Sequence, residues 1–222
     1  MCTSVRFSNT KGNMFFGRNL DWEFGYGEGP VIAPRNWNRT WRFEDDAHRQ
    51  LASRLAQEGT RPQAVIGIGI VAEDTPLYFD CMNESGLAAG GLLFAGFAEY
   101  EAKPVEGKLN VTAYELPLWV CRNFTTVDQA QAALEHVAIV GEGIAGMDEE
   151  QENVTRLFRT LQGVAMIEGA SIMKSGNFEK TIYTSGYSAE TATVYWNTYE
   201  GLSIETCSLR DHDLTGSALI VA

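Results

Sequence analysis

The chain has 222 residues, and its 17 Lys and Arg against 29 Asp and Glu give a formal net charge of −12. Hydrophobic residues make up 45% and charged residues 21%, which is ordinary for a folded protein with a sizeable core in one or two domains. The negative charge disfavours binding to nucleic acid or to anionic membranes, because phosphates need cations beside them. No apolar run reaches the ~18–20 residues that a membrane helix needs.

The four cysteines, Cys2, Cys81, Cys121 and Cys207, lie far apart in the chain. They are too sparse for a disulfide scaffold, and their spacing fits no zinc site. A reducing, cytoplasmic setting is the simplest interpretation. The segment Met1–Phe7 agrees with it, since no basic stretch followed by an apolar one predicts a secretory signal there.

Residues 1–44 have the pattern of β structure. Val5 and Phe7 alternate with polar residues, residues 9–13 form a turn, and Met14–Gly17 begins a return strand. This pattern predicts a hairpin. A loop rich in glycine and aromatic residues follows between residues 22 and 30.

The rest of the chain predicts strands, then helices, then strands again. Further strands are predicted at 64–72, 76–81 and 87–94, and a helix before them at 45–58. Three more helices are predicted at 112–123, 126–137 and 149–161. The last strands are predicted at 180–184, 193–199, 202–208 and 218–221. This order predicts an α+β fold with antiparallel sheets and helices layered outside them.

Cys2 is the first candidate for chemistry. Cysteine is small, so an aminopeptidase is expected to remove Met1 and leave Cys2 as the first residue. Its thiol would then lie beside a free α-amine, whose usual pKa of about 7.7–8.0 allows it to accept a proton near neutral pH. A nucleophile activated by its own terminal amine is a recognised arrangement. A buried or incidental cysteine is the alternative, and the position alone favours that alternative.

Three further candidate residues are Arg18 and Asp21 on the hairpin and Asn83 after the strand at 77–82. The return strand would bring Arg18 and Asp21 beside Cys2, where Arg18 favours the thiolate and Asp21 holds the protonated amine. A surface ion pair is the alternative for these two. Asn83 ends the strand, and its turn would aim a backbone N–H at a developing oxyanion. The alternative, which is favoured for Asn83 taken alone, is an asparagine selected for turn geometry.

Longer segments of the chain resemble a known family. They are Met-Cys-Thr at the start, Phe16–Trp22, Val65–Val71, Pro76–Asp80, Glu115–Val120, Thr181–Tyr187 and Asn197–Tyr199. They resemble the choloylglycine hydrolase family, which holds the bile salt hydrolases and the penicillin V acylases. The resemblance runs through residues 1–140 and again through about 150–222. It implies an N-terminal-nucleophile hydrolase with an αββα sandwich of antiparallel sheets.

The resemblance also implies roles for the candidate residues. Cys2 would be the nucleophile, Arg18 and Asp21 would organise it, and Asn83 would contribute its backbone N–H to the oxyanion hole. An asparagine at position 83 looks like the bile salt branch, since the penicillin branch tends to have tyrosine there.

The implied activity is conjugated bile salt hydrolysis, the cleavage of the amide between a bile acid and glycine or taurine. Leu20, Trp22, Phe24 and Tyr26 would lie near a pocket for the apolar acyl group. The partner would be a small amphipathic amide, with no nucleic acid, membrane, metal or cofactor. The protein would be a cytoplasmic, bacterial homo-oligomer.

The chain departs from the family pattern near residues 141–148, where a central block is missing from an otherwise single domain over 1–222. In the family that block carries a Leu-Thr-Asn segment that completes the oxyanion hole and a Ser-Arg-Phe segment beside the nucleophile. The family's Asn-Phe-Pro-Gly is also changed, to Leu93–Gly96. Losing one oxyanion-hole donor typically costs ~2.7–4 kcal/mol of transition-state stabilisation.

This departure predicts an incomplete sandwich, with sheet edges uncovered or covered by a partner chain. It also leaves two alternatives to bile salt hydrolysis. One is a shortened, catalytically impaired relative that acts as a ligand-binding or interaction protein. The other is an amidase of the penicillin V acylase type.

Overall fold

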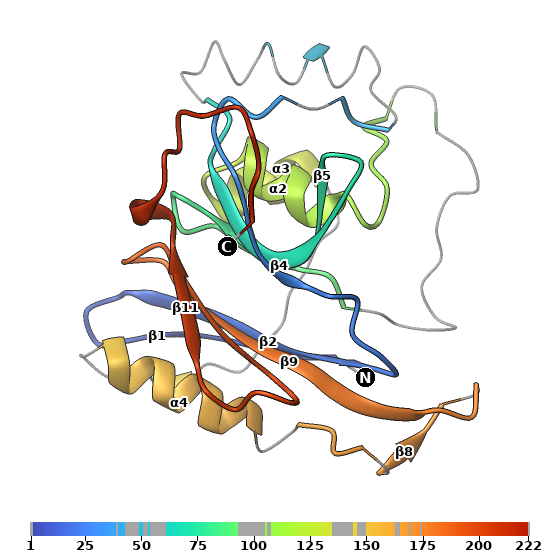
Figure 1. Ribbon diagram of the computed structural model, residues 1–222. Helices are drawn as coiled ribbons and strands as arrows, with labels where there is room; N and C mark the ends of the chain where they lie inside the picture. The colour runs from blue at the N-terminus through green and yellow to red at the C-terminus, as the bar shows by residue number, and fades with distance from the viewer. Residues whose placement is uncertain are drawn as a thin grey trace.

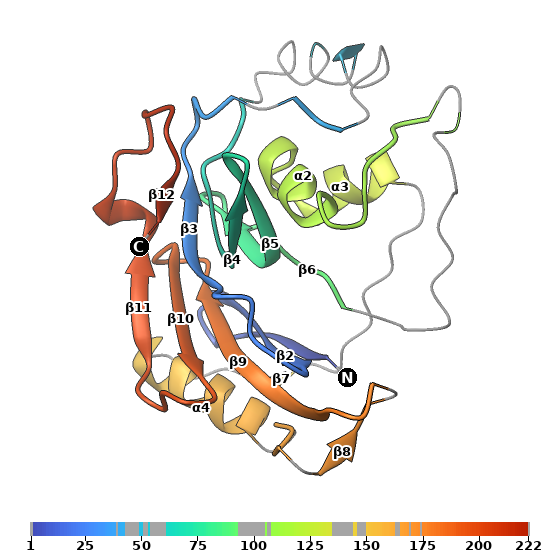
Figure 2. The same cartoon turned by 45° about the vertical axis from the view of Figure 1, so that its right-hand side comes forward.

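A computed structural model describes residues 2–38, 40–42, 49–50, 53, 61–92, 105, 108–134, 144–145, 150–162, 165–168, 170–173 and 175–221. Two β-sheets lie face to face, and helices cover the outer side of each (Figure 1). Figure 2 shows the four layers from the side, as helix, sheet, sheet, helix. The predicted α+β sandwich of the αββα type is therefore confirmed.

The larger sheet, sheet A, contains the N-terminal hairpin, which carries Arg18 and Asp21. Its strands run in the order β11 (Glu205–Ser208), β10 (Thr193–Thr198), β9 (Phe178–Ser188), β2 (Met14–Trp22), β1 (Thr3–Ser8) and β7 (Ile144–Ala145), and β8 (Ser171–Ile172) pairs with β9. All of these pairs are antiparallel except that of β1 with β7, which is parallel. A short 3-10 helix at Leu209–Asp211 follows β11.

The smaller sheet, sheet B, is wholly antiparallel. Its order is β12 (Ile220–Val221), β3 (Gly29–Ala33), β4 (Val65–Ala72), β5 (Thr75–Asn83) and β6 (Ala88–Gly90). The last strand of the chain thus returns to pair with β3. Strand β6 is shorter than the strand predicted at 87–94, whose last two residues lie outside the described part of the chain.

Helices cover the two outer faces. Helices α2 (Leu116–Asn123) and α3 (Val127–Leu134) lie beyond sheet B, and α4 (Glu150–Gln162) lies beyond sheet A (Figure 2). The apolar residues of α4 fall at helical spacing, which buries Leu157 and Phe158 against Phe7 and Phe15 of sheet A. The helix predicted at 45–58 lies largely outside the described residues.

The helix starts follow the local sequence. Pro117 occupies the first turn of α2, where a missing N–H costs no hydrogen bond. The hydroxyl of Thr126 accepts the N–H of Gln129 at 3.2 Å, as the predicted capping box requires. The Gln129 side chain, however, accepts the N–H and the hydroxyl of Thr125 rather than the N–H of Thr126.

The predicted N-terminal hairpin is confirmed. Asn9 closes its turn, because its side-chain oxygen accepts the N–H of Lys11 at 3.1 Å and that of Asn13 at 2.8 Å. Gly12 has φ +86°, a conformation that glycine adopts without strain. The register pairs Thr3 with Asn19, so the start of the chain returns to the middle of β2.

The inner strands of both sheets are present and paired in continuous order. Apolar side chains fill the space between the sheets, among them Leu20, Ile66, Met82 and Val194. On the outer side of β1, strand β7 pairs only with Phe7 and Ser8. Residues 3–6 have no strand partner on that side among the described residues, so the expected incomplete edge would be the edge at β1.

Gly17 gives a test of how α4 packs on sheet A. A Cβ at this position would lie 2.6 Å from the carbonyl oxygen of Ser185 and 2.7 Å from Leu157 Cδ2. We expect Gly17→Ala to lower the free energy of unfolding by about 1–3 kcal/mol, because neither neighbour can move freely. Gly29→Ala is the matched control, since nothing lies within 4 Å of its Cβ position. Equal melting temperatures for the two variants would contradict this packing.

Candidate active site

The hairpin register determines where Cys2 lies. Thr3 pairs with Asn19 and Ser4 with Arg18. Cys2 directly precedes Thr3, so the same register brings it toward Leu20 of β2. Cys2 is half-buried and packs against the core between the sheets. Its thiol also interacts electrostatically with the Arg18 guanidinium. The first residues of the chain and the middle of β2 are therefore brought together.

Arg18 is fully buried and held by backbone oxygens. Its Nη1 donates to the carbonyl of Phe79 at 3.0 Å and to that of Gly91 at 2.8 Å, and its Nε donates to Asn19 at 3.4 Å. Its Nη2 is buried and has no hydrogen-bond partner among the described residues. Backbone carbonyls thus hold Nη1 and Nε of Arg18, while the described residues leave Nη2 available as a donor.

Burial would lower the pKa of Arg18, but acidic groups around it act in the opposite direction. They are Tyr183, Asp80, Cys2 and Tyr187, and together they raise the pKa above its usual value. Arg18 therefore remains a cation although it is removed from water.

Asp80 of β5 is the buried carboxylate that faces Arg18. Its Oδ1 lies 3.9 Å from Arg18 Nη1 and accepts the hydroxyl of Tyr183. Its Oδ2 accepts the hydroxyl of Ser185 at 2.5 Å and that of Tyr187 at 2.7 Å. Burial raises the pKa of Asp80, and Arg18 and the three hydroxyl groups lower it, with a net rise. This cluster joins sheet A to sheet B.

Asp21 lies at the end of β2, next to the register shift between Leu20 and Asp21. It is 3% exposed, and its Oδ1 accepts the hydroxyl of Thr181 at 2.5 Å. Burial raises the pKa of Asp21, although the bond from Thr181 and positive charges, Arg18 among them, act to lower it. Thr181 of β9 thus fixes the carboxyl group of Asp21, and the positive charge of Arg18 acts on it.

Asn83 ends β5, and its polar groups make several hydrogen bonds in the structure. Its backbone N–H is donated to the carbonyl of Leu87 at 2.9 Å, which closes the β5–β6 hairpin. Its side-chain nitrogen donates to Cys121 at 2.8 Å and to Phe124 at 2.7 Å, and its side-chain oxygen accepts two backbone N–H groups. Asn83 thus joins the β5–β6 hairpin to α2 and the residue that follows it.

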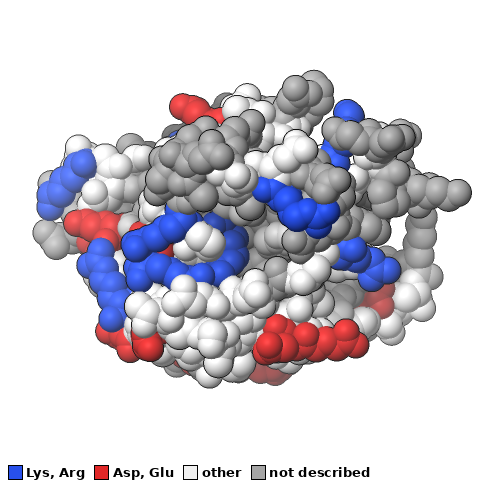
Figure 3. Space-filling model, turned by 90° about the horizontal axis from the view of Figure 1, so that it is seen from above, with Lys and Arg blue, Asp and Glu red and all other residues white. Residues whose placement is uncertain are grey.

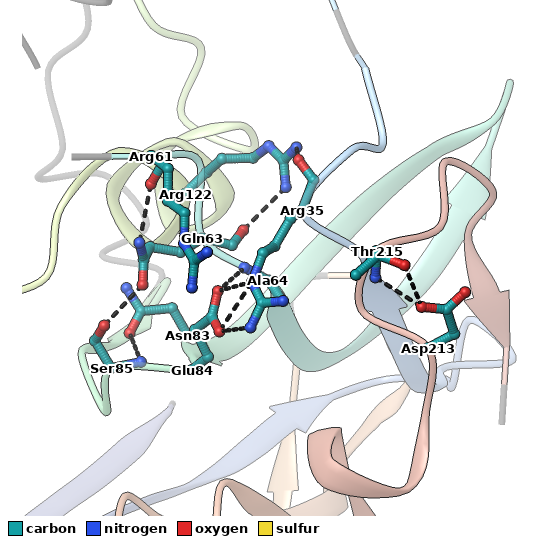
Figure 4. A network of polar contacts seen from close by, with 10 residues as sticks. All are labelled: Arg35, Arg61, Gln63, Ala64, Asn83, Glu84, Ser85, Arg122, Asp213 and Thr215. Atoms are coloured by element: carbon teal, nitrogen blue, oxygen red, sulfur yellow. Dashed lines mark hydrogen bonds and ion pairs between the residues drawn. The ribbon is translucent and has the colours of Figure 1, made fainter. Parts of the chain in front are cut away.

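Figure 4 shows the network in which Asn83 stands, at the end of β5. Arg122 donates to four backbone carbonyls there, those of Pro34, Arg35, Gln63 and Trp37. Burial lowers its pKa to about 10. The Glu84 carboxylate accepts hydrogen bonds from Nε of Arg35 at 2.8 Å and from the N–H of Ala64 at 3.0 Å. These contacts join α2 to the end of β3 and the start of β4, which is a structural role.

Charge is unevenly distributed over the surface. Figure 3 shows Lys and Arg side chains gathered near the middle of the face seen from above, with Asp and Glu side chains toward its margin. The net charge of −12 therefore does not describe every face of the molecule.

The four aromatic and apolar residues expected near a pocket differ in exposure. Leu20 is 7% exposed and belongs to the core between the sheets. Trp22 is half-buried, and its indole N–H has no partner among the described residues. Phe24 and Tyr26 are 52% and 43% exposed, and their rings lie 5.2 Å apart. The last three could contact a ligand from solvent, and Leu20 has little surface to offer.

The exposed rings continue inward. The ring of Tyr26 lies 5.5 Å from that of Phe79, which lies 6.4 Å from that of Tyr183. Because Tyr183 donates to Asp80, this aromatic row connects the surface to the carboxylate that faces Arg18. Offset and edge contacts at these separations are favourable.

Sequence reasoning missed the cluster around Asp80. Two signals were available, a carboxylate within an apolar strand and the alternation of Tyr183, Ser185 and Tyr187 along β9. Residues two apart on a strand share a face, so the three hydroxyls had to point the same way. Which carboxylate they face depends on how the two sheets stack.

All four cysteine thiols are free, and those of Cys81, Cys121 and Cys207 are buried. Within the described part of the chain, no group of three His, Cys, Asp or Glu side chains is placed to hold a metal ion. None of the helices described there is long and apolar enough to cross a bilayer.

The family model for linear amide C–N hydrolases of the choloylglycine hydrolase family matches residues 2–148 and 142–222. The chain belongs to this family. A bile salt hydrolase/transferase of Bifidobacterium longum subsp. longum is 32% identical, with 99% of each chain covered. That alignment runs over 324 positions against 222 residues here, so at least 102 positions have no counterpart in this chain.

Solved structures share the fold. A mutant conjugated bile acid hydrolase from Clostridium perfringens matches with TM-score 0.80 and 18% identity, covering 100% of this chain and 96% of that chain. A penicillin V acylase from Agrobacterium tumefaciens matches with TM-score 0.72 and 12% identity, covering 99% and 90%. Both are therefore similar in architecture to this choloylglycine hydrolase family member.

The raised pKa of Asp21 gives a test by pH. A carboxyl group whose folded pKa exceeds its unfolded pKa stabilises the fold only at low pH, and this contribution is lost as pH rises through the folded pKa. We therefore expect Asp21→Asn, which keeps an oxygen for Thr181, to gain in melting temperature relative to the parent as pH rises from 4 to 8. Thermal unfolding across that range measures the difference. A difference that is constant or shrinks with pH would contradict the assignment.

Proposed function

We propose that this chain is a conjugated bile salt hydrolase that uses Cys2 as an N-terminal nucleophile. The observation that carries the proposal is the register of the β1–β2 hairpin, which brings Cys2 together with the buried Arg18. The relatives named bile salt hydrolase/transferase and conjugated bile acid hydrolase support the choice of substrate.

The mechanism needs Met1 to be removed, so that Cys2 carries a free α-amine. The thiol sulfur attacks the amide carbonyl carbon, and the α-amine takes the thiol proton. The tetrahedral intermediate collapses to a thioester, and the α-amine returns the proton to the leaving nitrogen of glycine or taurine. Water then hydrolyses the thioester, which releases the bile acid and restores the thiol.

Two charged residues act on this site in the proposal. Arg18 favours the thiolate, because a buried cation next to a thiol stabilises the charged form. The free Nη2 of Arg18 is a donor that can serve groups developing negative charge. Asp21, fixed by Thr181, holds the protonated α-amine.

The acyl group has an aromatic surface available to it. Trp22 ends the strand that carries Arg18, and Phe24 and Tyr26 follow it and are well exposed. Flat aromatic surface suits a rigid apolar acyl group such as a steroid acid, while the charged glycine or taurine end stays near solvent. The free indole N–H of Trp22 adds one polar contact.

We also infer that the central block expected by the family is missing between residues 141 and 148. The two family-model matches meet at residues 142–148, and β7, which pairs with the open edge of β1, lies in the same place. Such an edge favours association with another chain, which supports a homo-oligomer. A cytoplasmic location remains the simplest setting for four free cysteines.

The test is release of glycine from glycocholate by the protein lacking Met1. We expect free glycine from the parent chain and none above background from Cys2→Ala, because no other group replaces the thiol. Reaction with ninhydrin measures glycine, and mass spectrometry confirms the loss of Met1. A rate about 10²–10³ below that of the Bifidobacterium longum relative is expected, since the segment that completes the oxyanion hole in the family belongs to the missing central block.

The controls separate the alternatives. Cys207→Ala changes a buried thiol on β11 and should leave glycine release intact. Hydrolysis of penicillin V in place of glycocholate would identify an acylase of that type. Folded protein that has lost Met1 and releases glycine from neither substrate would overturn the proposal and leave a ligand-binding relative.

A further inference from the structure

Asp80 has no part in the mechanism above, yet it is a fully buried carboxylate with hydrogen bonds to both of its oxygens. It is 0% exposed, and three hydroxyl groups of β9 donate to it. Its only cationic contact among the described residues is Arg18, which is also 0% exposed. A buried pair of this kind is costly to assemble, so its position next to Cys2 calls for an explanation.

We propose that Asp80 is a positioning residue that holds the Arg18 guanidinium toward the Cys2 thiol. The proposal rests on the proposed function, since it assigns Asp80 to the same site. Asp80 and the carbonyls of Phe79 and Gly91 all engage Arg18 Nη1. They fix the guanidinium from the side of sheet B, and its Nη2 has no hydrogen-bond partner in the part of the chain that the structure describes.

The three hydroxyl groups determine where the carboxylate points. Tyr183 donates to Oδ1, while Ser185 and Tyr187 donate to Oδ2, so both oxygens are held from sheet A. Tyr187 also donates to the backbone oxygen of Asp80 and accepts the N–H of Ile68 from β4. The carboxylate thus has no freedom to turn away from Arg18.

Charge supports the same assignment. The titratable groups that face Arg18 are Tyr183 and Tyr187 of β9, Asp80 of β5, Asp21 of β2 and Cys2 before β1. Asp80 is the carboxyl group that lies 3.9 Å from Arg18 Nη1, so it is the group placed to pair with the cation. Removing one partner of a buried pair leaves an uncompensated charge, which tends to draw Arg18 toward water and away from its position.

The test measures the reactivity of the Cys2 thiol, which requires neither substrate nor a free α-amine. Alkylation by iodoacetamide is followed against pH, and mass spectrometry of the N-terminal peptide reports Cys2 alone. We expect Asp80→Asn to slow alkylation at pH 7 about tenfold and to move the pH profile upward, because a displaced Arg18 no longer favours the Cys2 thiolate. A cation next to an acidic group shifts its ionisation by at least about one pH unit. Unchanged or faster alkylation in folded Asp80→Asn would overturn the proposal.

An Arg18→Met background shows whether Asp80 acts through Arg18. There, Asp80→Asn should cause no further loss, because no cation remains to be positioned. An equal loss in both backgrounds would mean that Asp80 supports the fold alone. These results stand whether or not glycocholate is hydrolysed, so failure of this proposal and failure of the proposed function are distinguishable.

A second pair of variants keeps the test open if Asp80→Asn does not fold. Tyr187→Phe removes one hydroxyl from Asp80 and keeps its charge, so we expect slower alkylation by a smaller factor. Tyr195→Phe is the matched control, because its hydroxyl bonds Glu150 of α4 instead. Alkylation that is equally fast in both variants would count against the positioning role.

Discussion

The buried contact between Arg18 and Asp80 is the constraint on which the site depends. Arg18 belongs to sheet A and Asp80 to sheet B, and both are removed from water, so the two sheets must stack in one relative position to pair them. Hydroxyl groups from β9 satisfy the carboxylate, and backbone carbonyls at Phe79 and Gly91 satisfy the cation. The same contact therefore joins the layers and places a cation beside the thiol.

The two halves of the sandwich have different roles. Sheet A carries the candidate chemistry, because the β1–β2 hairpin places Cys2, Arg18 and Asp21 on adjacent strands. Sheet B carries the support, through Asp80 in its interior and the network of Asn83 and Arg122 at one end.

Local sequence predicted the elements well where pattern alone decides them. The hairpin, the apolar face of α4 and strands β4 and β5 follow from alternation, helical spacing and turn residues, whereas β3 begins inside the loop expected at residues 22–30. Local sequence leaves the role of Asn83 open, because an asparagine after a strand is equally suited to close a turn or to expose its N–H. The competing acceptor, the Leu87 carbonyl, becomes visible only when the hairpin is folded.

The sequence by itself determined the nucleophile candidate and the neighbouring charges, since these residues lie in one hairpin near the start of the chain. It also determined the family, through short motifs spread along the whole chain. Tertiary structure alone decided that Asp80 faces Arg18, that Leu20 is core, and that Phe24 and Tyr26 remain exposed. The physical reason is that contacts between stacked sheets depend on the relative position of strands far apart in the chain. No local periodicity specifies that position, and burial of the whole core selects it.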